Sequence, residues 1–153
     1  MKLQEGVHPI GPGEGERLIE VWEASVRATH DFLSESDIAY LKPLVAPALR
    51  GMENLFGVRD ESGLLAGFAG TAAGKIEALF VHPSWHRVGA GRRLVRHAVE
   101  NLGAVGVDVN EQNPGAVAFY LRLGFRIEGR SEVDSMGLPF PLLHMRIDDV
   151  SSL

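Results

Sequence analysis

The chain has 153 residues, the length of one typical domain, and 45% of them are hydrophobic, which is enough to form a buried core. A net charge of −5 argues against nucleic acid as a main partner, and the absence of cysteine excludes disulfides and a cysteine nucleophile. No stretch of 18 apolar residues could span a membrane, residues 1–5 lack a signal-peptide core, and the six histidines lack metal-ligand spacing. We therefore expect a single cytoplasmic domain over residues 1–153, with no metal and no membrane partner.

The N-terminal third predicts one strand and two helices. Residues 3–7 form a candidate strand, and 14–29 a helix with one apolar face. Ser34-Glu35-Ser36-Asp37 resembles a capping box at the start of a second helix, which prolines 43 and 47 should kink or shorten.

A hairpin follows these helices. Residues 55–60 and 64–71 predict two strands joined by the turn Glu61-Ser62-Gly63. Gly67 and Gly70 should weaken the second strand, and they leave space for either a ligand or a close backbone.

A strand over residues 76–81, a glycine loop over 86–91 and a helix come next. Glycines allow the backbone to approach a ligand, and the free N–H groups of a helix N-terminus attract anions. The arrangement therefore indicates a site for a phosphate or pyrophosphate. On its own, Gly89-Ala90-Gly91 is equally compatible with an ordinary strand-to-helix turn.

The last third predicts a strand ending at Val109, a helix from Pro114, and a pair of strands over 126–134 and 142–147. Asn113 suits the N-cap of that helix and Pro114 its first position.

Residues 107–125, VDVNEQNPGAVAFYLRLGF, resemble the second half of the coenzyme A site of the GCN5-related N-acetyltransferase (GNAT) superfamily. The family's loop, Gln/Arg-x-x-Gly-x-Gly/Ala, is matched at Gly89 and Gly91, whereas His86 replaces the usual Gln or Arg. The resemblance covers residues 75 to about 147, and segments 22–33 and 129–134 resemble the small bacterial YjaB-like members. It implies an α/β (α+β) fold with about four helices, in which a mixed, mostly antiparallel sheet is splayed between its fourth and fifth strands.

The resemblance also implies acetyl-CoA as co-substrate, held mainly by backbone groups. The pantetheine arm would lie along the fourth strand, and the pyrophosphate on the glycine loop, where Arg87 supplies a donor in place of the missing Gln or Arg. The implied cofactor-binding residues are Leu79, Phe80, Val81, Arg87, Val88, Gly89, Ala90, Gly91, Arg92, Asn110, Asn113, Ala116 and Tyr120.

The same resemblance suggests roles in the chemistry. Tyr120 matches the family tyrosine near the coenzyme A sulfur, where its phenol can donate a proton to the thiolate or hydrogen-bond to it; a core aromatic is the less favoured alternative. Glu77 is the first candidate for general base, with Glu111 and Asn110 as alternatives, and a water chain could connect the base to the amine. His30, Phe32 and Glu111 are expected to border the acceptor, although a lone histidine is more often structural.

We interpret the chain as an acetyl-CoA-dependent N-acetyltransferase that acts by direct attack of an amine on the thioester. The acceptor is expected to be a small-molecule amine or a peptide, and the protein a monomer or homodimer. One alternative is an acyl-CoA-binding sensor that keeps the fold without turnover. Another is transfer of longer acyl chains or to oxygen, for which Gly67, Gly70 and Gly74 leave room.

Overall fold

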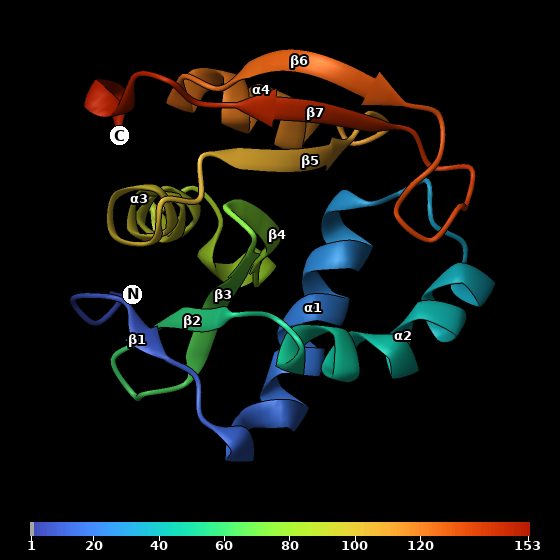
Figure 1. Ribbon diagram of the computed structural model, residues 1–153. Helices are drawn as coiled ribbons and strands as arrows, with labels where there is room; N and C mark the ends of the chain where they lie inside the picture. The colour runs from blue at the N-terminus through green and yellow to red at the C-terminus, as the bar shows by residue number, and fades with distance from the viewer. Residues whose placement is uncertain (1) are drawn as a thin grey trace.

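The computed structural model describes residues 2–153 and consists of a seven-stranded sheet with helices packed against it (Figure 1). The strand order is β1-β2-β3-β4-β5-β7-β6. The strands are β1 (His8–Pro9), β2 (Asn54–Arg59), β3 (Leu65–Ala72), β4 (Lys75–Val81), β5 (Gly106–Asn110), β6 (Arg126–Ser131) and β7 (Leu142–Arg146). The helices are α1 (Gly15–Thr29), α2 (Glu35–Arg50), α3 (Ala90–Leu102) and α4 (Pro114–Leu123), and 3₁₀ turns cover Pro12–Glu14, Pro83–Trp85 and Val150–Ser152.

The sheet is splayed between β4 and β5. These two strands are parallel and are in register only at Lys75↔Gly106 and Ile76↔Val107, whereas the other neighbouring strands pair antiparallel. Beyond Ile76 the two strands separate, so the edge of β4 that faces β5 is not paired with it from residue 77 onward. The mixed, mostly antiparallel and splayed sheet that the resemblance implies is therefore confirmed.

Two hydrophobic clusters fix the helices on the sheet. Leu94 and Val95 of α3 are buried in one cluster with residues of β2 to β5 and α4. Val21 and Trp22 of α1 are buried in the other with Phe68 of β3. Burial of each such side chain contributes about 1.5–3 kcal/mol, so packing holds the elements on both sides of the splay.

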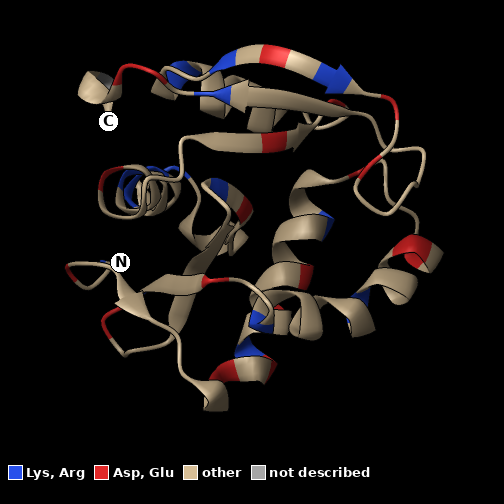
Figure 2. Ribbon diagram, in the orientation of Figure 1, with Lys and Arg blue, Asp and Glu red and all other residues tan. Residues whose placement is uncertain are grey.

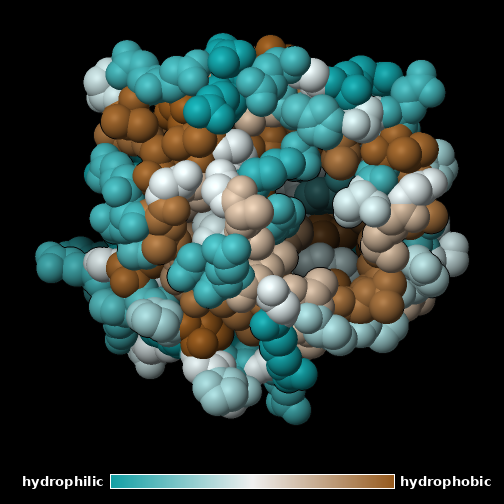
Figure 3. All heavy atoms as spheres, in the orientation of Figure 1, coloured by the Kyte–Doolittle hydropathy of each residue, from teal (hydrophilic) through white to brown (hydrophobic). Residues whose placement is uncertain are grey.

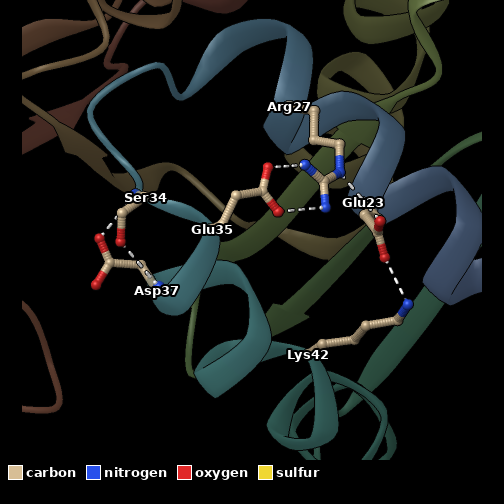
Figure 4. Close-up of polar contacts among 6 residues, drawn as sticks. All are labelled: Glu23, Arg27, Ser34, Glu35, Asp37 and Lys42. Carbon is tan, nitrogen blue, oxygen red and sulfur yellow. Dashed lines mark hydrogen bonds and ion pairs between the residues drawn. The ribbon is translucent and has the colours of Figure 1, made fainter.

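Helices α1 and α2 are joined by a surface ion-pair network (Figure 4). Arg27 binds Glu23 at 3.0 Å and Glu35 at 2.5 Å, and Lys42 binds Glu23 at 2.6 Å. Exposed pairs of this kind are each worth about 0.2–1 kcal/mol, so they align the two helices more than they stabilise them.

The predicted capping box is also confirmed. Ser34 Oγ accepts a hydrogen bond from the Asp37 backbone N–H, and the Asp37 carboxylate accepts one from the Ser34 N–H. Helix α2 continues through Pro43 and Pro47 to Arg50, so of the two predicted effects, a kink or a shortening, the shortening does not occur. The box at its start and the buried side chains near its two ends, Ile38 and Leu49, hold α2 on the molecule despite the amide donors that the prolines lack.

The N-terminus differs from the prediction as well. Leu3 makes an isolated bridge to Asp60, and β1 begins only at His8. Gly6 lies between them with φ +82°, a left-handed conformation that interrupts an extended strand.

The strand glycines provide space for protein rather than ligand. A Cβ on Gly67 would lie 3.2 Å from the Phe80 carbonyl oxygen, and one on Gly70 would overlap the Met52 sulfur. The room these glycines were expected to leave for a longer acyl chain is therefore filled. Within residues 2–153, no helix combines the length and apolar character that a membrane crossing requires.

Candidate active site

A cleft of about 670 Å³ occupies the splay between β4 and β5. Both strands, the loop before α3, the first turn of α3 and one face of α4 contribute to its walls. On the side where α1 approaches β5, the molecular surface is hollowed and has a hydrophobic floor (Figure 3). The cleft is therefore walled by both of the sequence segments that resemble the coenzyme A site.

The glycine loop is shaped for anion binding by its backbone. Arg87 and Gly89 have φ angles of +64° and +86°, and the first turn of α3 leaves N–H groups without intrahelical partners. The positive φ of Arg87 is strained for a residue with a side chain, and such strain is concentrated at functional sites. Basic residues follow along α3 (Figure 2), which adds to the positive potential of its N-terminus.

His86 explains how the loop tolerates a departure from the family pattern. Its Nε2 lies 3.0 Å from the Val81 carbonyl oxygen, so the ring ties the loop to the end of β4. Trp85, at the end of the 3₁₀ turn before the loop, is buried in the core and anchors the loop. Gly91 lies against Phe119, because a Cβ there would be 3.2 Å from the Phe119 ring. Helix α3 can thus approach α4 closely.

Two asparagines stand at the β5 side of the cleft. Asn113 is buried, and its Oδ1 accepts a 3.1 Å hydrogen bond from the Ala116 N–H, which confirms it as the N-cap of α4. Asn110 Oδ1 is buried and has no hydrogen-bond partner among residues 2–153. A buried acceptor without a partner is costly, so it suits a ligand that brings a donor into the cleft.

Tyr120 lies on α4 with its side chain buried and in the cleft wall. Its ring makes edge-to-face contacts with Phe119 and Phe125, with centroids 5.0 and 5.2 Å apart. Burial raises the pKa of the phenol far above its usual value, so the hydroxyl keeps its proton across the working pH range. The described residues provide no hydrogen bond to this hydroxyl, which leaves it free to donate to a ligand.

Glu77 is exposed and lines the cleft. The β3–β4 register passes from Gly70↔Ala78 to Thr71↔Ile76, so Glu77 is an extra residue in β4 without a partner in β3. It is also the first residue of β4 beyond the last pair with β5. The bulge therefore places one carboxylate where the splay opens.

Glu111, the alternative to Glu77, is engaged elsewhere. The Arg130 guanidinium binds its two oxygens at 2.6 and 3.0 Å and holds the pKa of the carboxyl below its usual value. Glu111 is not among the residues lining the cleft, and neither are Phe32 and Val88. All the other predicted site residues line the cleft: Leu79 to Val81, Arg87, Gly89 to Arg92, Asn110, Asn113, Ala116, Tyr120, Glu77 and His30.

His30 and Phe32 link the α1–α2 loop to other elements around the cleft. His30 Nδ1 lies 2.8 Å from Thr29 Oγ1, and burial lowers the pKa of the ring. The rings of His30 and Phe32 are 5.4 Å apart, and Phe32 also meets Phe140, 5.8 Å away, in the segment before β7. Phe32 thus joins the α1–α2 loop to the segment before β7, while His30 forms part of the cleft lining.

Sequence reasoning missed a polar network beside the cleft. Asp108 of β5 lines the cleft and contacts both His144 of β7 and Lys75 of β4. The alternation Val107-Asp108-Val109-Asn110 could have shown that Asp108 shares a face with Asn110. Its partners come from strands far apart in the sequence, so no local motif indicated them.

Comparison with known proteins gives consistent matches. Residues 36–148 match the family described as "Acetyltransferase (GNAT) domain". The chain is 42% identical to the peptidyl-lysine N-acetyltransferase YjaB of Salmonella typhimurium over 86% of its own length and 90% of that protein. The solution structure of apo-form YjaB from Escherichia coli superposes with a TM-score of 0.84 at 37% identity, over 95% of this chain and 97% of that one. The PaiA N-acetyltransferase of Thermoplasma acidophilum, solved in complex with coenzyme A, shares the fold at 20% identity and a TM-score of 0.72, over 97% of this chain and 100% of that one.

Proposed function

The chain belongs to the GNAT acetyltransferase family and is an N-acetyltransferase, and we propose that its acceptor is the side-chain amine of a lysine in a peptide or protein. The observation that carries this proposal is the 42% identity to peptidyl-lysine N-acetyltransferases over 86% of the chain. The surface is compatible with it, because the hollow where α1 approaches β5 faces solvent directly (Figure 3). A sensor without turnover is the less favoured interpretation, since the matched relatives are named as enzymes.

We propose that the residues predicted from the sequence hold the co-substrate, acetyl-CoA, whose thioester supplies the activated acetyl group. The N–H groups of the loop and of the first turn of α3 would bind the pyrophosphate. The backbone of Leu79 to Val81, unpaired with β5, would bind the pantetheine arm as an added strand and polarise the thioester oxygen. Asn110 and Asn113 would meet the arm from the other wall.

The chemistry needs one proton acceptor and one proton donor. Glu77 is proposed to take the proton from the amine, directly or through water, because it stands at the opening of the splay and is exposed. Tyr120 is proposed to donate its hydroxyl hydrogen to the departing sulfur. The raised pKa of Tyr120 keeps the hydroxyl protonated, so that it is available as a hydrogen-bond donor to the sulfur as negative charge develops there.

The test is an acceptor assay with a matched pair of peptides. The tripeptide Gly-Lys-Gly, acetylated at its N-terminus and amidated at its C-terminus, offers one amine; the same peptide with norleucine offers none. With acetyl-CoA present, we expect free thiol to be released and the lysine peptide to gain one acetyl group, with no thiol above background for the norleucine peptide. Turnover of free polyamines or amino acids in the absence of any turnover of lysine peptides would contradict the proposal.

A further inference from the structure

A chain of four polar side chains crosses the sheet from β6 to β4. Ser131 Oγ lies 2.6 Å from His144 Nε2, and His144 Nδ1 lies 2.6 Å from Asp108 Oδ1. The other carboxylate oxygen, Asp108 Oδ2, accepts a 2.6 Å hydrogen bond from Lys75 Nζ. One oxygen of Asp108 is thus held by a histidine and the other by a lysine ammonium.

This chain ends at the point where the splay opens. Ile76↔Val107 is the last registered pair between β4 and β5, so Asp108 is the first residue of β5 beyond it. Val107 and Val109 are buried in the cluster beneath α3, and alternation along the strand points Asp108 to the opposite face. Asp108 and Glu77 are therefore the first side chains on the two separating strands, and both line the cleft.

The ion pair between Asp108 and Lys75 indicates which chemical group this carboxylate can bind. Asp108 lines the cleft, and one of its carboxylate oxygens already holds the ammonium group of Lys75, a residue outside the cleft lining. An alkylammonium is also the chemical group of the proposed acceptor. We propose that Asp108 Oδ2 is the binding site for the acceptor's ammonium group, and that Lys75 occupies this site until the acceptor displaces it. The proposal rests on the proposed function. His144 and Ser131 are positioning residues, because they fix Asp108 through its other oxygen.

The electrostatics of the site agree with this role. Burial favours the neutral acid, but the hydrogen bonds from His144 and Lys75 outweigh it and hold the pKa of Asp108 below its usual value. Asp108 therefore remains charged at neutral pH and is better suited to binding a cation than to accepting a proton. Glu77, whose carboxylate has no described ion-pair partner among residues 2–153, is left to act as the base.

A purely structural role for the same ion pair makes the opposite prediction. If Lys75 and Asp108 only brace the short pairing of β4 with β5, removal of either should weaken ligand binding or leave it unchanged. If Lys75 occupies the acceptor's site, its removal should improve binding of an amine, because the competing internal ammonium is gone. The Lys75→Gln variant separates the two roles.

The experiment measures binding of n-butylammonium, which carries the charged end of a lysine side chain, to enzyme saturated with coenzyme A at pH 7. n-Butanol is the neutral control. We expect Asp108→Asn to raise the Kd about tenfold or more, as for loss of a charged hydrogen bond. We expect Lys75→Gln to lower the Kd by about two- to fivefold, as for removal of a partly exposed competing ion pair.

Several outcomes would overturn the proposal: no n-butylammonium binding in the wild type, equal binding of n-butanol, an unchanged Kd in Asp108→Asn, or an unchanged or raised Kd in Lys75→Gln. If Asp108→Asn fails to fold, Lys75→Gln decides alone, since it keeps the carboxylate. Failure of the proposed function looks different: lysine peptides are not acetylated, yet n-butylammonium still binds and responds to both substitutions.

Discussion

The two sides of the splay are built by different means. On the β4–α3 side, the loop's φ angles, the start of α3 and the unpaired edge of β4 offer backbone groups to a ligand. On the β5–β7 side, the polar groups are side chains, and they are held by one another in a chain that crosses four strands, from β6 to β4. The first side is the one proposed to bind the cofactor, and the second is the one proposed to bind the acceptor.

The difference has a physical basis. Backbone groups are present whatever the side chain, so a loop that keeps its glycines can replace Gln or Arg with His86 and use the ring to fix itself to Val81. A site built from side chains does not tolerate replacement of its residues in this way. Loss of Asp108 would leave Lys75 and His144 without their carboxylate partner.

The largest effect is expected where the two sides meet, at Tyr120. Tyr120→Phe removes only the hydroxyl, so the ring contacts with Phe119 and Phe125 are kept. We expect kcat to fall by about 10²–10⁴-fold if the phenol protonates the leaving thiolate. The acetyl-CoA Kd, measured by calorimetry, should change little. Near-normal turnover under conditions where chemistry limits the rate would assign Tyr120 to packing.

The second-largest effect is expected at Glu77, the proposed general base for the acceptor. Glu77→Gln should lower kcat/KM for a lysine peptide by about a hundredfold near pH 7, where the amine is protonated and needs a base. As the pH approaches the ordinary amine pKa near 10.4, free amine accumulates and the deficit should shrink. A deficit that stays constant from pH 7 to 10 would indicate that Glu77 positions the acceptor and does not accept its proton.

The smallest effect is expected at Val88, and it concerns only the binding of the cofactor. Val88 is half-exposed on the loop, so its substitution should cost little packing. Val88→Asp puts a negative charge beside the proposed pyrophosphate site and should raise the acetyl-CoA Kd about tenfold at low salt. Val88→Asn, of similar shape and without charge, should bind nearly as well as the wild type. Equal losses in both variants would show that loop conformation, and not charge, was disturbed.

Val88 is a sharper probe than the loop glycines. A side chain at Gly91 would press against Phe119, and Gly89 has a positive φ that other residues adopt only with strain. A loss of binding after substitution of either glycine would therefore mix packing, strain and charge.

Sequence reasoning predicted the β4-to-α4 half of the molecule well, because its signals are local. The N-cap at Asn113 and the glycine loop are contiguous motifs, and β4 and α3 follow from periodicity. It failed where contacts span long separations. Asp108 and His144 are 36 residues apart and Ser131 and His144 are 13 apart, and neither spacing is a motif.

Single residues failed for related reasons. Glu111 was expected at the mouth of the cleft, but it does not line the cleft, and its carboxylate binds Arg130, 19 residues away in the sequence. The break before β1 depends on the left-handed conformation of Gly6, which composition alone does not disclose.

The division of the site between its two walls can be tested most directly by amide chemical-shift mapping in two steps. Acetyl-CoA should perturb residues 79–92 and 113–120 with little effect on β7. A lysine peptide added to enzyme saturated with coenzyme A should then perturb Asp108, His144 and the 29–32 segment, with little further change in the glycine loop. Perturbation of the same residues by both ligands, or of β7 by the cofactor and the glycine loop by the peptide, would contradict the account.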